Sequence, residues 1–187
     1  MKKLAIFASG RGSNALKIFD YLTNNDQLSV ACILSNRSIS GIINSAKELQ
    51  IPHLVFNKRE FNDSKIIKNY LSEHEIDFIV LAGFLWLIPA WLIHLYPDKI
   101  LNIHPALLPK YGGKGMYGSN IHKAVKENED NVSGITIHLV NKDYDEGRIV
   151  LQSKVALDSK DSVHDIAHKV LTLEHHFYLR VIEGFCQ

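Results

Sequence analysis

The first half of the chain alternates short apolar runs with segments in which apolar residues recur at helical spacing. Short apolar runs closed by Gly, Ser or other polar residues are typical of buried parallel strands, and apolar residues three and four positions apart are typical of helices with one buried face. The pattern predicts strands at 4–8, 28–34, 53–56, 78–82 and 100–103. It predicts helices at 13–22, 40–49, 63–74 and 89–96.

The second half of the chain has a different pattern. Residues 105–118 contain two prolines and four glycines, which predicts a long loop. Residues 133–140 alternate apolar and polar side chains, with Thr136 and His138 on one face, and 149–155 follows after a short polar link, so the two segments are expected to pair as antiparallel strands. A last helix is expected to begin at 161 or 162, where Asp or Ser can cap it, and to run towards 181.

Strands that alternate with helices build sheets covered by helices. The fold class expected here is α/β: an open, mostly parallel Rossmann-like sheet with helices on both faces and an antiparallel strand pair near the C-terminal end. The sequence shows no linker, internal repeat or low-complexity stretch. We therefore expect one domain over residues 1–187.

Composition and charge narrow the classes of function. Lys and Arg number 21 and Asp and Glu number 20, so a net charge of +1 offers no field for nucleic acid or a membrane surface. Cys32 and Cys186 are far apart and form no CxxC pair, so neither a disulfide framework nor a thiolate zinc site is expected. The apolar stretch 4–8 is too short for a signal peptide or a membrane span, so the expected compartment is the cytoplasm.

The first predicted strand leads into a glycine-rich turn, Ser9-Gly-Arg-Gly-Ser-Asn-Ala15, which opens a helix. Glycines let the backbone approach a ligand, and the N–H groups at a helix start bind anions. A dinucleotide site also needs an acidic residue at the end of the second strand, and 35–37 is Ser-Asn-Arg instead. The turn therefore favours a phosphate site that uses Ser13 and Asn14, with a merely tight turn as the alternative.

Asn102 and His104 stand at the end of a predicted buried strand, just before Pro105. Residues two apart in a strand face the same side, and the carboxyl ends of such strands line the ligand crevice of open α/β sheets. An Asn amide can donate to a developing oxyanion, and a His can donate or move a proton near neutral pH. This pair is a candidate catalytic site. Asp145, in the link between the last two strands, could equally be a solvated turn residue.

Other histidines and aromatic residues favour structural roles. His164 and His168 have the i, i+4 spacing of a zinc site, but no third ligand is evident, so no metal is expected there. His175 and His176 cannot share one helix face. The aromatic residues near position 86 are expected to form core or pocket wall and not a platform for stacking nucleic-acid bases.

These motifs together resemble the folate-dependent formyltransferases, in order and over essentially the whole chain. The resemblance rests on the glycine-rich turn 9–14, the Leu-Ala-Gly-Phe of 81–84, the Asn-Ile-His-Pro-Ala-Leu-Leu-Pro of 102–109, and Gly-x-Thr-Ile-His at 134–138 with a following Asp145-x-Gly147. It implies transfer of the formyl group of 10-formyltetrahydrofolate to an amine. The Gly-Ser-Asn turn indicates 5-phosphoribosylglycinamide as the acceptor, in purine (IMP) biosynthesis.

The resemblance also implies roles for individual residues. The catalytic residues would be Asn102, His104 and Asp145. The ribonucleotide would be held by Gly12, Ser13, Asn14 and Glu174. The folate would be held by Leu85, Trp86, Leu87, Ile88, Asn102, Asn141 and Asp145, with 141–145 as one wall of its pocket. The partners would be these small molecules, the protein would be a monomer or homodimer, and no metal would be needed.

Three positions depart from the family pattern. Trp86 stands where a basic residue is common, and residues 111–119 form a longer, more glycine-rich loop than the family usually has. The basic residue that contacts the folate tail has no certain match, with Lys65 as a candidate.

The alternative within the same family is a formyltransferase for another acceptor, either methionyl-tRNA or an amino sugar nucleotide. An enzyme for methionyl-tRNA is expected to carry a further C-terminal domain, whereas this sequence ends at Gln187.

Two other classes of function are also possible. A NADP-dependent reductase could use the glycine-rich turn with Arg37, and a non-catalytic nucleotide-binding module could use the turn alone. Neither the reductase nor the binding module explains Asn102, His104 and Asp145.

Overall fold

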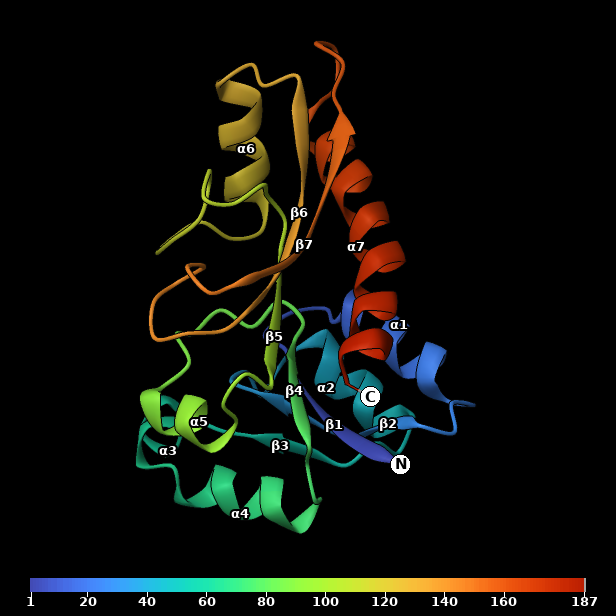
Figure 1. The fold of residues 1–187 in the computed structure, drawn as a ribbon, viewed down its shortest axis with the longest axis vertical. Coiled ribbons are helices and arrows are strands. Elements are labelled where there is room, and N and C mark those ends of the chain that lie inside the picture. Colours follow the sequence, from blue (N-terminus) through green and yellow to red (C-terminus); the bar gives the residue numbers. More distant parts are fainter. Residues whose placement is uncertain (187) are drawn as a thin grey trace.

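A single sheet of seven strands, in the order β3-β2-β1-β4-β5-β6-β7, organises the protein (Figure 1). The computed structural model describes residues 1–186. The strands are β1 (Lys2–Phe7), β2 (Leu28–Ser35), β3 (His53–Val55), β4 (Phe78–Leu81), β5 (Ile100–His104), β6 (Val132–Leu139) and β7 (Ile149–Ala156). The strands from β3 to β5 run parallel, and β5-β6 and β6-β7 pair antiparallel, which confirms the predicted α/β class.

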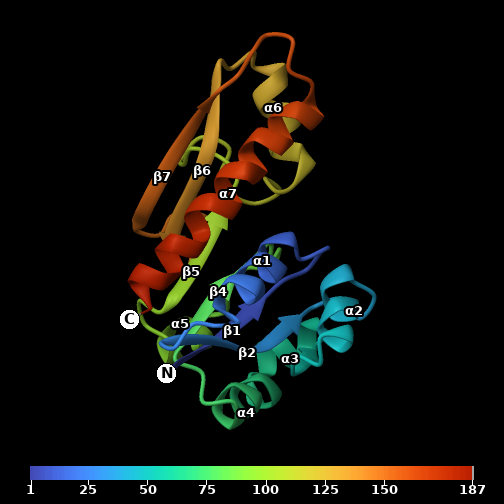
Figure 2. The same cartoon turned by 90° about the vertical axis from the view of Figure 1, so that its right-hand side faces the viewer.

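Helices cover both faces of the sheet. They are α1 (Ser13–Leu22), α2 (Gly41–Glu48), α3 (Lys58–Asp63), α4 (Lys65–Glu73), α5 (Ala90–Leu95), α6 (Ser119–Glu127) and α7 (Val163–Phe185). One core cluster joins the sheet to α1, α2, α6 and α7, and the other joins it to α3, α4 and α5. Figure 2 shows α7 running along the sheet from the region of α6 down to the N-terminal strands.

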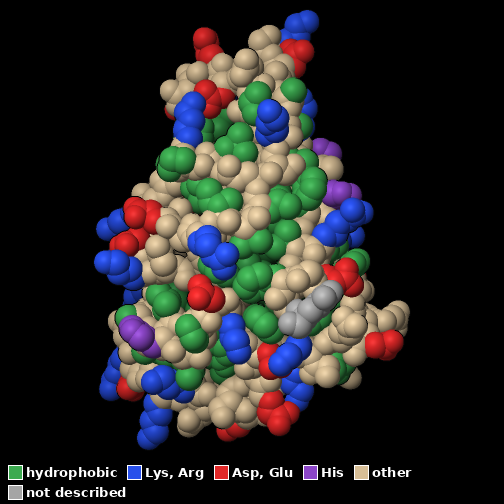
Figure 3. Space-filling view, in the orientation of Figure 1, with side chains coloured by type: hydrophobic (Ala, Val, Ile, Leu, Met, Phe, Trp, Pro, Cys, Tyr) green, Lys and Arg blue, Asp and Glu red, His purple; other side chains and the backbone are tan. Residues whose placement is uncertain are grey.

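Alternation along the central strands explains how both faces are buried. On β1, Leu4 and Ile6 face the first cluster, and Ala5 and Phe7 face the second. All four side chains are fully buried, as expected for a central parallel strand between two layers of helices. The outermost strand, β7, is more open. Its Ile149 and Val150 are exposed, and Figure 3 shows apolar side chains gathered over the middle of this face.

The structure corrects the predicted helices at several points. The helix expected at 63–74 is α4, and a separate short helix before it, α3, was not predicted; Ser64, with a positive φ of 70°, lies between the two. The sequence prediction also missed α6 and placed the end of α7 too early, since α7 reaches Phe185. Pro89 lies just before α5 with an extended ψ of 150°, so the helix begins at Ala90. Among the residues that the structure describes, no helix is long and apolar enough to cross a membrane.

Candidate functional site

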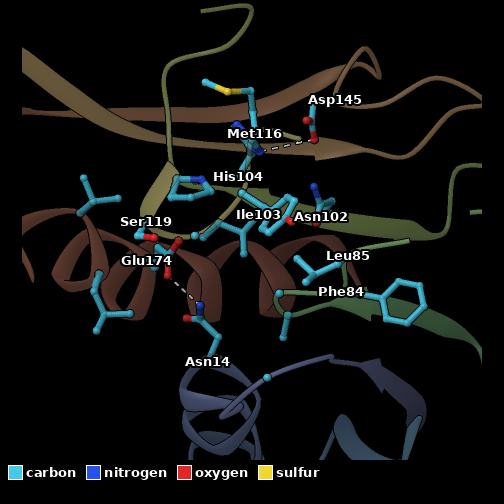
Figure 4. Close-up of a pocket in the computed structure, with 18 of the residues that line it drawn as sticks. Asn14, Phe84, Leu85, Asn102, Ile103, His104, Met116, Ser119, Asp145 and Glu174 are labelled. Carbon is cyan, nitrogen blue, oxygen red and sulfur yellow. Dashed lines mark hydrogen bonds and ion pairs between the residues drawn. The ribbon is translucent and has the colours of Figure 1, made fainter. Parts of the chain in front are cut away.

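The carboxyl ends of β1, β4 and β5 open into a cavity of about 700 Å³. Such ends form the usual ligand crevice of open α/β sheets. Four stretches line most of it: 10–14, 82–85, 102–105 and 113–119. Asp145 and Glu174 complete the wall from a loop and from α7 (Figure 4). Segments far apart in the sequence therefore meet around one space large enough for small-molecule substrates.

The turn between β1 and α1 forms one end of the cavity. Gly12 caps α1 with a left-handed backbone, φ 79°, and an added Cβ would lie 2.6 Å from Cδ1 of Ile42. Glycine is therefore required here both for conformation and for space. The backbone N–H groups that begin α1 face this end, where no acidic residue occupies the first turn. The geometry suits an anionic group such as a phosphate.

Asn14 and Glu174 meet at the same end of the cavity. Asn14 Nδ2 donates a hydrogen bond to Glu174 Oε2 over 2.8 Å (Figure 4). Glu174 is buried, and burial raises the pKa of its carboxyl to about 7, although the Asn14 hydrogen bond opposes the rise. The carboxyl is thus poised to change its charge near neutral pH, beside the anion site.

Asn102 and His104 lie on one face of β5, as the period of a strand requires. Their cross-strand partners on β6 are His138 and Thr136, respectively. The Thr136 hydroxyl donates to the Ala106 carbonyl over 2.7 Å and accepts from Leu108 N–H over 3.0 Å. These bonds fix the chain that leaves β5, so both functional side chains stand on a rigid support.

Asp145 reaches this pair from the loop between β6 and β7. Its Oδ1 lies 3.5 Å from His104 Nδ1, and its Oδ2 accepts a hydrogen bond from Gly113 N–H over 2.9 Å. Asp145 itself has a positive φ of 58°, a region that Asp tolerates better than most residues. Burial raises the pKa of its carboxyl, but the neighbouring His104 and the hydrogen bond from Gly113 N–H hold it below its usual value. An ionised carboxylate therefore faces His104.

The imidazole of His104 is enclosed on both sides. Its Nε2 donates to the Tyr111 carbonyl over 2.8 Å, and its side chain is almost fully buried. Burial lowers the pKa of His104 more than the Asp145 charge and the Tyr111 hydrogen bond raise it. The Asp145 charge thus raises the pKa of His104, but desolvation is the larger effect and sets the net direction.

Residues 85–88 lie partly outside the cavity. Leu85 lines it, whereas Trp86, Leu87 and Ile88 are not among the lining residues. Leu85 N–H donates to Ser9 Oγ over 3.1 Å, and Leu87 N–H donates to the Tyr144 hydroxyl over 3.0 Å. These bonds tie the segment to the glycine-rich turn on one side and to the loop 141–145 on the other. Asn141 is also not among the lining residues; its side-chain oxygen accepts from Asp143 N–H over 3.0 Å.

The Trp86 ring packs against Phe56, Phe61 and Phe84, with centroids 5.7–6.3 Å away. The ammonium of Lys58 lies 4.7 Å from the centre of the Trp86 ring, close enough for a cation–π contact. Lys58 is thus a cation that the structure places against segment 85–88, and the assignment of Lys65 to the folate tail stays a prediction.

Two residues that the sequence prediction did not select also belong to this site. His122 lines the cavity, and His138 lies beside Asn102 and Asp145. Tyr144, which falls within the predicted wall 141–145, also lines the cavity. The alternation of 133–140 already put His138 on a polar face, and this was the available signal. His122 sits on α6, which was not predicted. In the part of the chain that the structure describes, no group of three or more His, Cys, Asp or Glu side chains is placed to hold a metal ion.

Comparisons with known proteins agree with this geometry. The sequence pattern of the family described as "Formyl transferase" matches residues 2–182. The chain is 44% identical to a chloroplastic phosphoribosylglycinamide formyltransferase of Arabidopsis thaliana, covering 100% of this chain and 66% of that protein. It is 36% identical to the phosphoribosylglycinamide formyltransferase of Haemophilus influenzae, covering 100% of this chain and 88% of that one.

A solved structure shares the fold over its full length. Glycinamide ribonucleotide transformylase 1 from Geobacillus kaustophilus superposes with a TM-score of 0.90 at 29% identity, covering 100% of both chains. Since the family pattern spans nearly all of the sequence and the relatives align from end to end of it, the chain belongs to the formyl transferase family.

Proposed function

We propose that the protein transfers the formyl group of 10-formyltetrahydrofolate to the amine of 5-phosphoribosylglycinamide, giving the N-formyl product and tetrahydrofolate, in purine biosynthesis. One observation carries the proposal. Asn102, His104 and Asp145 come from two separate segments and converge on one cavity, with an anion-binding helix start at its other end. A reaction between a phosphorylated amine and a formyl donor needs this combination of features.

The ribonucleotide occupies the end formed by Gly12, Ser13 and Asn14 in this proposal. Its phosphate accepts hydrogen bonds from the start of α1, where the helix dipole also favours negative charge. Glu174 lies 2.8 Å from Asn14 and is placed to accept hydrogen bonds from the ribonucleotide. With the phosphate held there, the amine can extend towards His104, which lines the same cavity.

The folate occupies the space beside segment 85–88 and the loop 141–145. Peptide N–H and C=O groups of this segment can bond a flat heterocycle, and the apolar side chains around it exclude water. Trp86, Leu87, Ile88 and Asn141 would contribute through backbone or through movement on binding, since the ligand-free cavity does not include them. The ammonium of Lys58, 4.7 Å from the centre of the Trp86 ring, suits the acidic tail of a folate.

The chemistry follows from the three polar groups. The amine nitrogen forms a bond to the formyl carbon, and the carbonyl oxygen becomes a tetrahedral oxyanion. The Asn102 amide and a protonated His104 donate hydrogen bonds to this oxyanion, and one such donor is typically worth about 3–4 kcal/mol. The bond from the formyl carbon to the folate nitrogen then breaks, and the new amide remains on the ribonucleotide.

The reaction also requires one proton to move from the attacking amine to the leaving folate nitrogen. The attacking amine loses one proton, and the leaving folate nitrogen gains one. Asp145 stabilises the imidazolium of His104 from 3.5 Å and, as an ionised carboxylate, can accept or relay a proton through water. Burial lowers the pKa of His104, and an oxyanion that develops beside the ring raises it again, so the charged form becomes favourable as the tetrahedral intermediate forms.

The proposal also covers the domain organisation, oligomeric state, compartment and partners of the protein. Residues 1–187 act as one formyltransferase domain, as a monomer or homodimer in the cytoplasm, without nucleic acid or a membrane as partner. A reducing cytoplasm is compatible with Cys32 and Cys186, which are both buried free thiols.

The direct test is a formyl-transfer assay with 10-formyltetrahydrofolate and 5-phosphoribosylglycinamide. We expect N-formyl product only when both are present. Thermal melting distinguishes the proposed formyltransferase from a NADP-dependent reductase, because a ligand that binds only the folded protein raises Tm. 5-Phosphoribosylglycinamide should raise Tm and NADP should not; the reverse result would favour a NADP-dependent enzyme.

A further inference from the structure

Asn102 and His138 are direct partners across β5 and β6. In an antiparallel pair, such partners have side chains on the same face and within contact distance. The register between β6 and β7 shifts between Ile137 and His138, where the extra residue is Val150 on β7. The His138 ring itself lies close to both Asn102 and Asp145.

The two ring nitrogens of His138 have different partners. Nδ1 lies 3.0 Å from the Leu139 carbonyl oxygen, and Nε2 lies 3.0 Å from Asn102 Nδ2. A carbonyl oxygen can only accept, so Nδ1 must carry the proton. In the neutral ring Nε2 then holds a lone pair, which accepts a hydrogen from the Asn102 amide nitrogen.

Asp145 does not compete for this arrangement. Its Oδ1 lies 3.6 Å from His138 Nε2, which is too long for a hydrogen bond. The opposite tautomer would set a lone pair on Nδ1 against the Leu139 carbonyl and leave the Nε2 proton without a close acceptor. Of the two neutral tautomers, only the one protonated at Nδ1 gives both ring nitrogens a partner, and it leaves Asp145 facing His104.

We propose that His138 is a positioning residue that holds the side-chain amide of Asn102 with its nitrogen towards Nε2, so that one N–H is bound and the other is free for the oxyanion. This inference rests on the proposed function, in which the Asn102 amide donates a hydrogen bond to the oxyanion. Without the lone pair of His138, the Asn102 amide can rotate and present its oxygen to the reacting formyl group. An oxygen there would repel the oxyanion instead of stabilising it.

Gly147 supports the same assignment from the other side of the ring. A Cβ at this position would lie 1.6 Å from the Leu139 oxygen and 3.3 Å from His138 Nδ1. Only glycine lets the chain pass so close to the carbonyl that accepts from His138. The Asp145-x-Gly147 motif therefore serves two residues of the site: Asp145 faces His104, and Gly147 leaves room for the bond that fixes His138.

The first test does not depend on turnover. Nitrogen-15 NMR of the full-length protein without ligand reports which ring nitrogen of His138 carries the proton. We expect Nδ1 protonated and Nε2 unprotonated. A ring protonated at Nε2, alone or together with Nδ1, would overturn the proposal even if the protein proves to catalyse a different reaction.

The second test uses kinetics. His138→Ala removes the acceptor, whereas His138→Gln can place an amide oxygen near the position of Nε2. We expect His138→Ala to lower kcat about tenfold or more, with the KM of each substrate changed by less than about threefold, and His138→Gln to recover most of the loss. Melting of each variant shows whether it folds.

The double variant shows through which residue His138 acts. In an Asn102→Ala background, His138→Ala should lower kcat by less than about twofold further, because residues that act as a unit are not additive. An undiminished loss in that background, or an effect confined to KM, would contradict the proposal. If His138→Ala does not fold, His138→Gln in both backgrounds and the NMR measurement still decide it.

Discussion

Asn14 Nδ2 donates a hydrogen bond to Glu174 Oε2 over 2.8 Å, which joins the second residue of α1 to the middle of α7 across one end of the cavity. Glu174 is only 8% exposed. No cation is paired with it in the described part of the chain, and burial raises its pKa to about 7. The protein therefore carries a buried acid at the place where the ribonucleotide is proposed to bind.

This arrangement predicts how stability depends on pH. The pKa of Glu174 rises from 4.5 in the unfolded chain to about 7 in the folded protein, so the folded state favours the neutral acid. Its contribution to stability is complete below pH 4.5 and is lost as the pH rises through 7. Glu174→Gln removes this titration. Relative to that variant, the free energy of unfolding of the natural protein should fall by up to about 3 kcal/mol across this range.

Urea unfolding at a series of pH values measures the difference. Glu127→Gln is the matched control, since Glu127 is an exposed glutamate near the end of α6. This control should follow the natural protein at every pH. Parallel curves for Glu174→Gln and the natural protein would show that Glu174 does not titrate as the structure indicates.

A second prediction concerns the phosphate end of the cavity. Gly12→Ala places a Cβ 2.6 Å from Ile42 Cδ1 on a backbone with φ 79°, so the turn must shift away from its anion-binding geometry. We expect the KM for 5-phosphoribosylglycinamide to rise about tenfold or more, equivalent to about 1.4 kcal/mol of binding, and the KM for the folate to change far less.

Gly10→Ala provides the control in the same turn, because nothing lies within 4 Å of its added Cβ. It should leave both KM values close to those of the natural protein. Steady-state kinetics with each substrate varied in turn will separate the two effects. Equal rises in both KM values for Gly12→Ala would move the phosphate away from this turn.

The strand pattern was sufficient to predict much of this site. Apolar runs located the strands, and the period of two put Asn102 and His104 on one face at the end of β5. The position of Asp145 came only from family resemblance, because it depends on a loop that returns to β5 and on a positive φ that no local pattern signals. The partnership of Asn102 with His138 depends on the β5-β6 register, which the sequence does not reveal.

Two helices show why the remaining elements escaped prediction. The sole buried residue of α3 is Phe61, and α3 ends at Asp63, just before Ser64, whose positive φ of 70° is unusual for a residue other than glycine. The buried face of α6 is Ile121, His122 and Val125, too few apolar positions for a clear helical stripe, and the helix follows a glycine-rich loop. In both cases tertiary contacts supply what the local sequence lacks.

A third prediction concerns the backbone of segment 85–88. In the ligand-free protein Leu85 N–H is bonded to Ser9 Oγ and Leu87 N–H to the Tyr144 hydroxyl. Within the described residues, the amides of Trp86 and Ile88 have no such partner. A folate analogue should therefore increase hydrogen-exchange protection mainly at Trp86 and Ile88. NMR-detected exchange resolves the individual amides.

Tyr144→Phe is the companion variant for this segment. Loss of the hydroxyl frees Leu87 N–H, which should exchange faster in the ligand-free protein, and the KM for the folate should rise a few-fold as the two walls loosen, since one hydrogen bond contributes about 0.5–1.5 kcal/mol. Protection that rises elsewhere, with 85–88 unchanged on binding the analogue, would place the folate at a different part of the cavity.

The last prediction concerns Asp145 and His104. Asp145→Asn keeps the shape of the side chain and removes the charge that lies 3.5 Å from His104 Nδ1. Burial already lowers the pKa of His104, and the Asp145 charge is the largest influence that raises it. Without that charge the pKa must fall further. The limb of the pH–rate profile that reports His104 should therefore move to lower pH, and turnover should fall at least about tenfold, as expected for a group that supports proton transfer.

His104→Ala should cost at least as much turnover, and the double variant should lose less than the product of the two single losses, since the two residues act as one unit. The KM for 5-phosphoribosylglycinamide should change little in Asp145→Asn, because the phosphate is proposed to bind at 12–14, which line another part of the cavity. Melting must accompany the kinetics, since the Asp145 carboxylate also accepts from Gly113 N–H over 2.9 Å and supports the glycine-rich loop. A folded Asp145→Asn protein with full turnover and an unmoved profile would exclude the proposed role of this carboxylate.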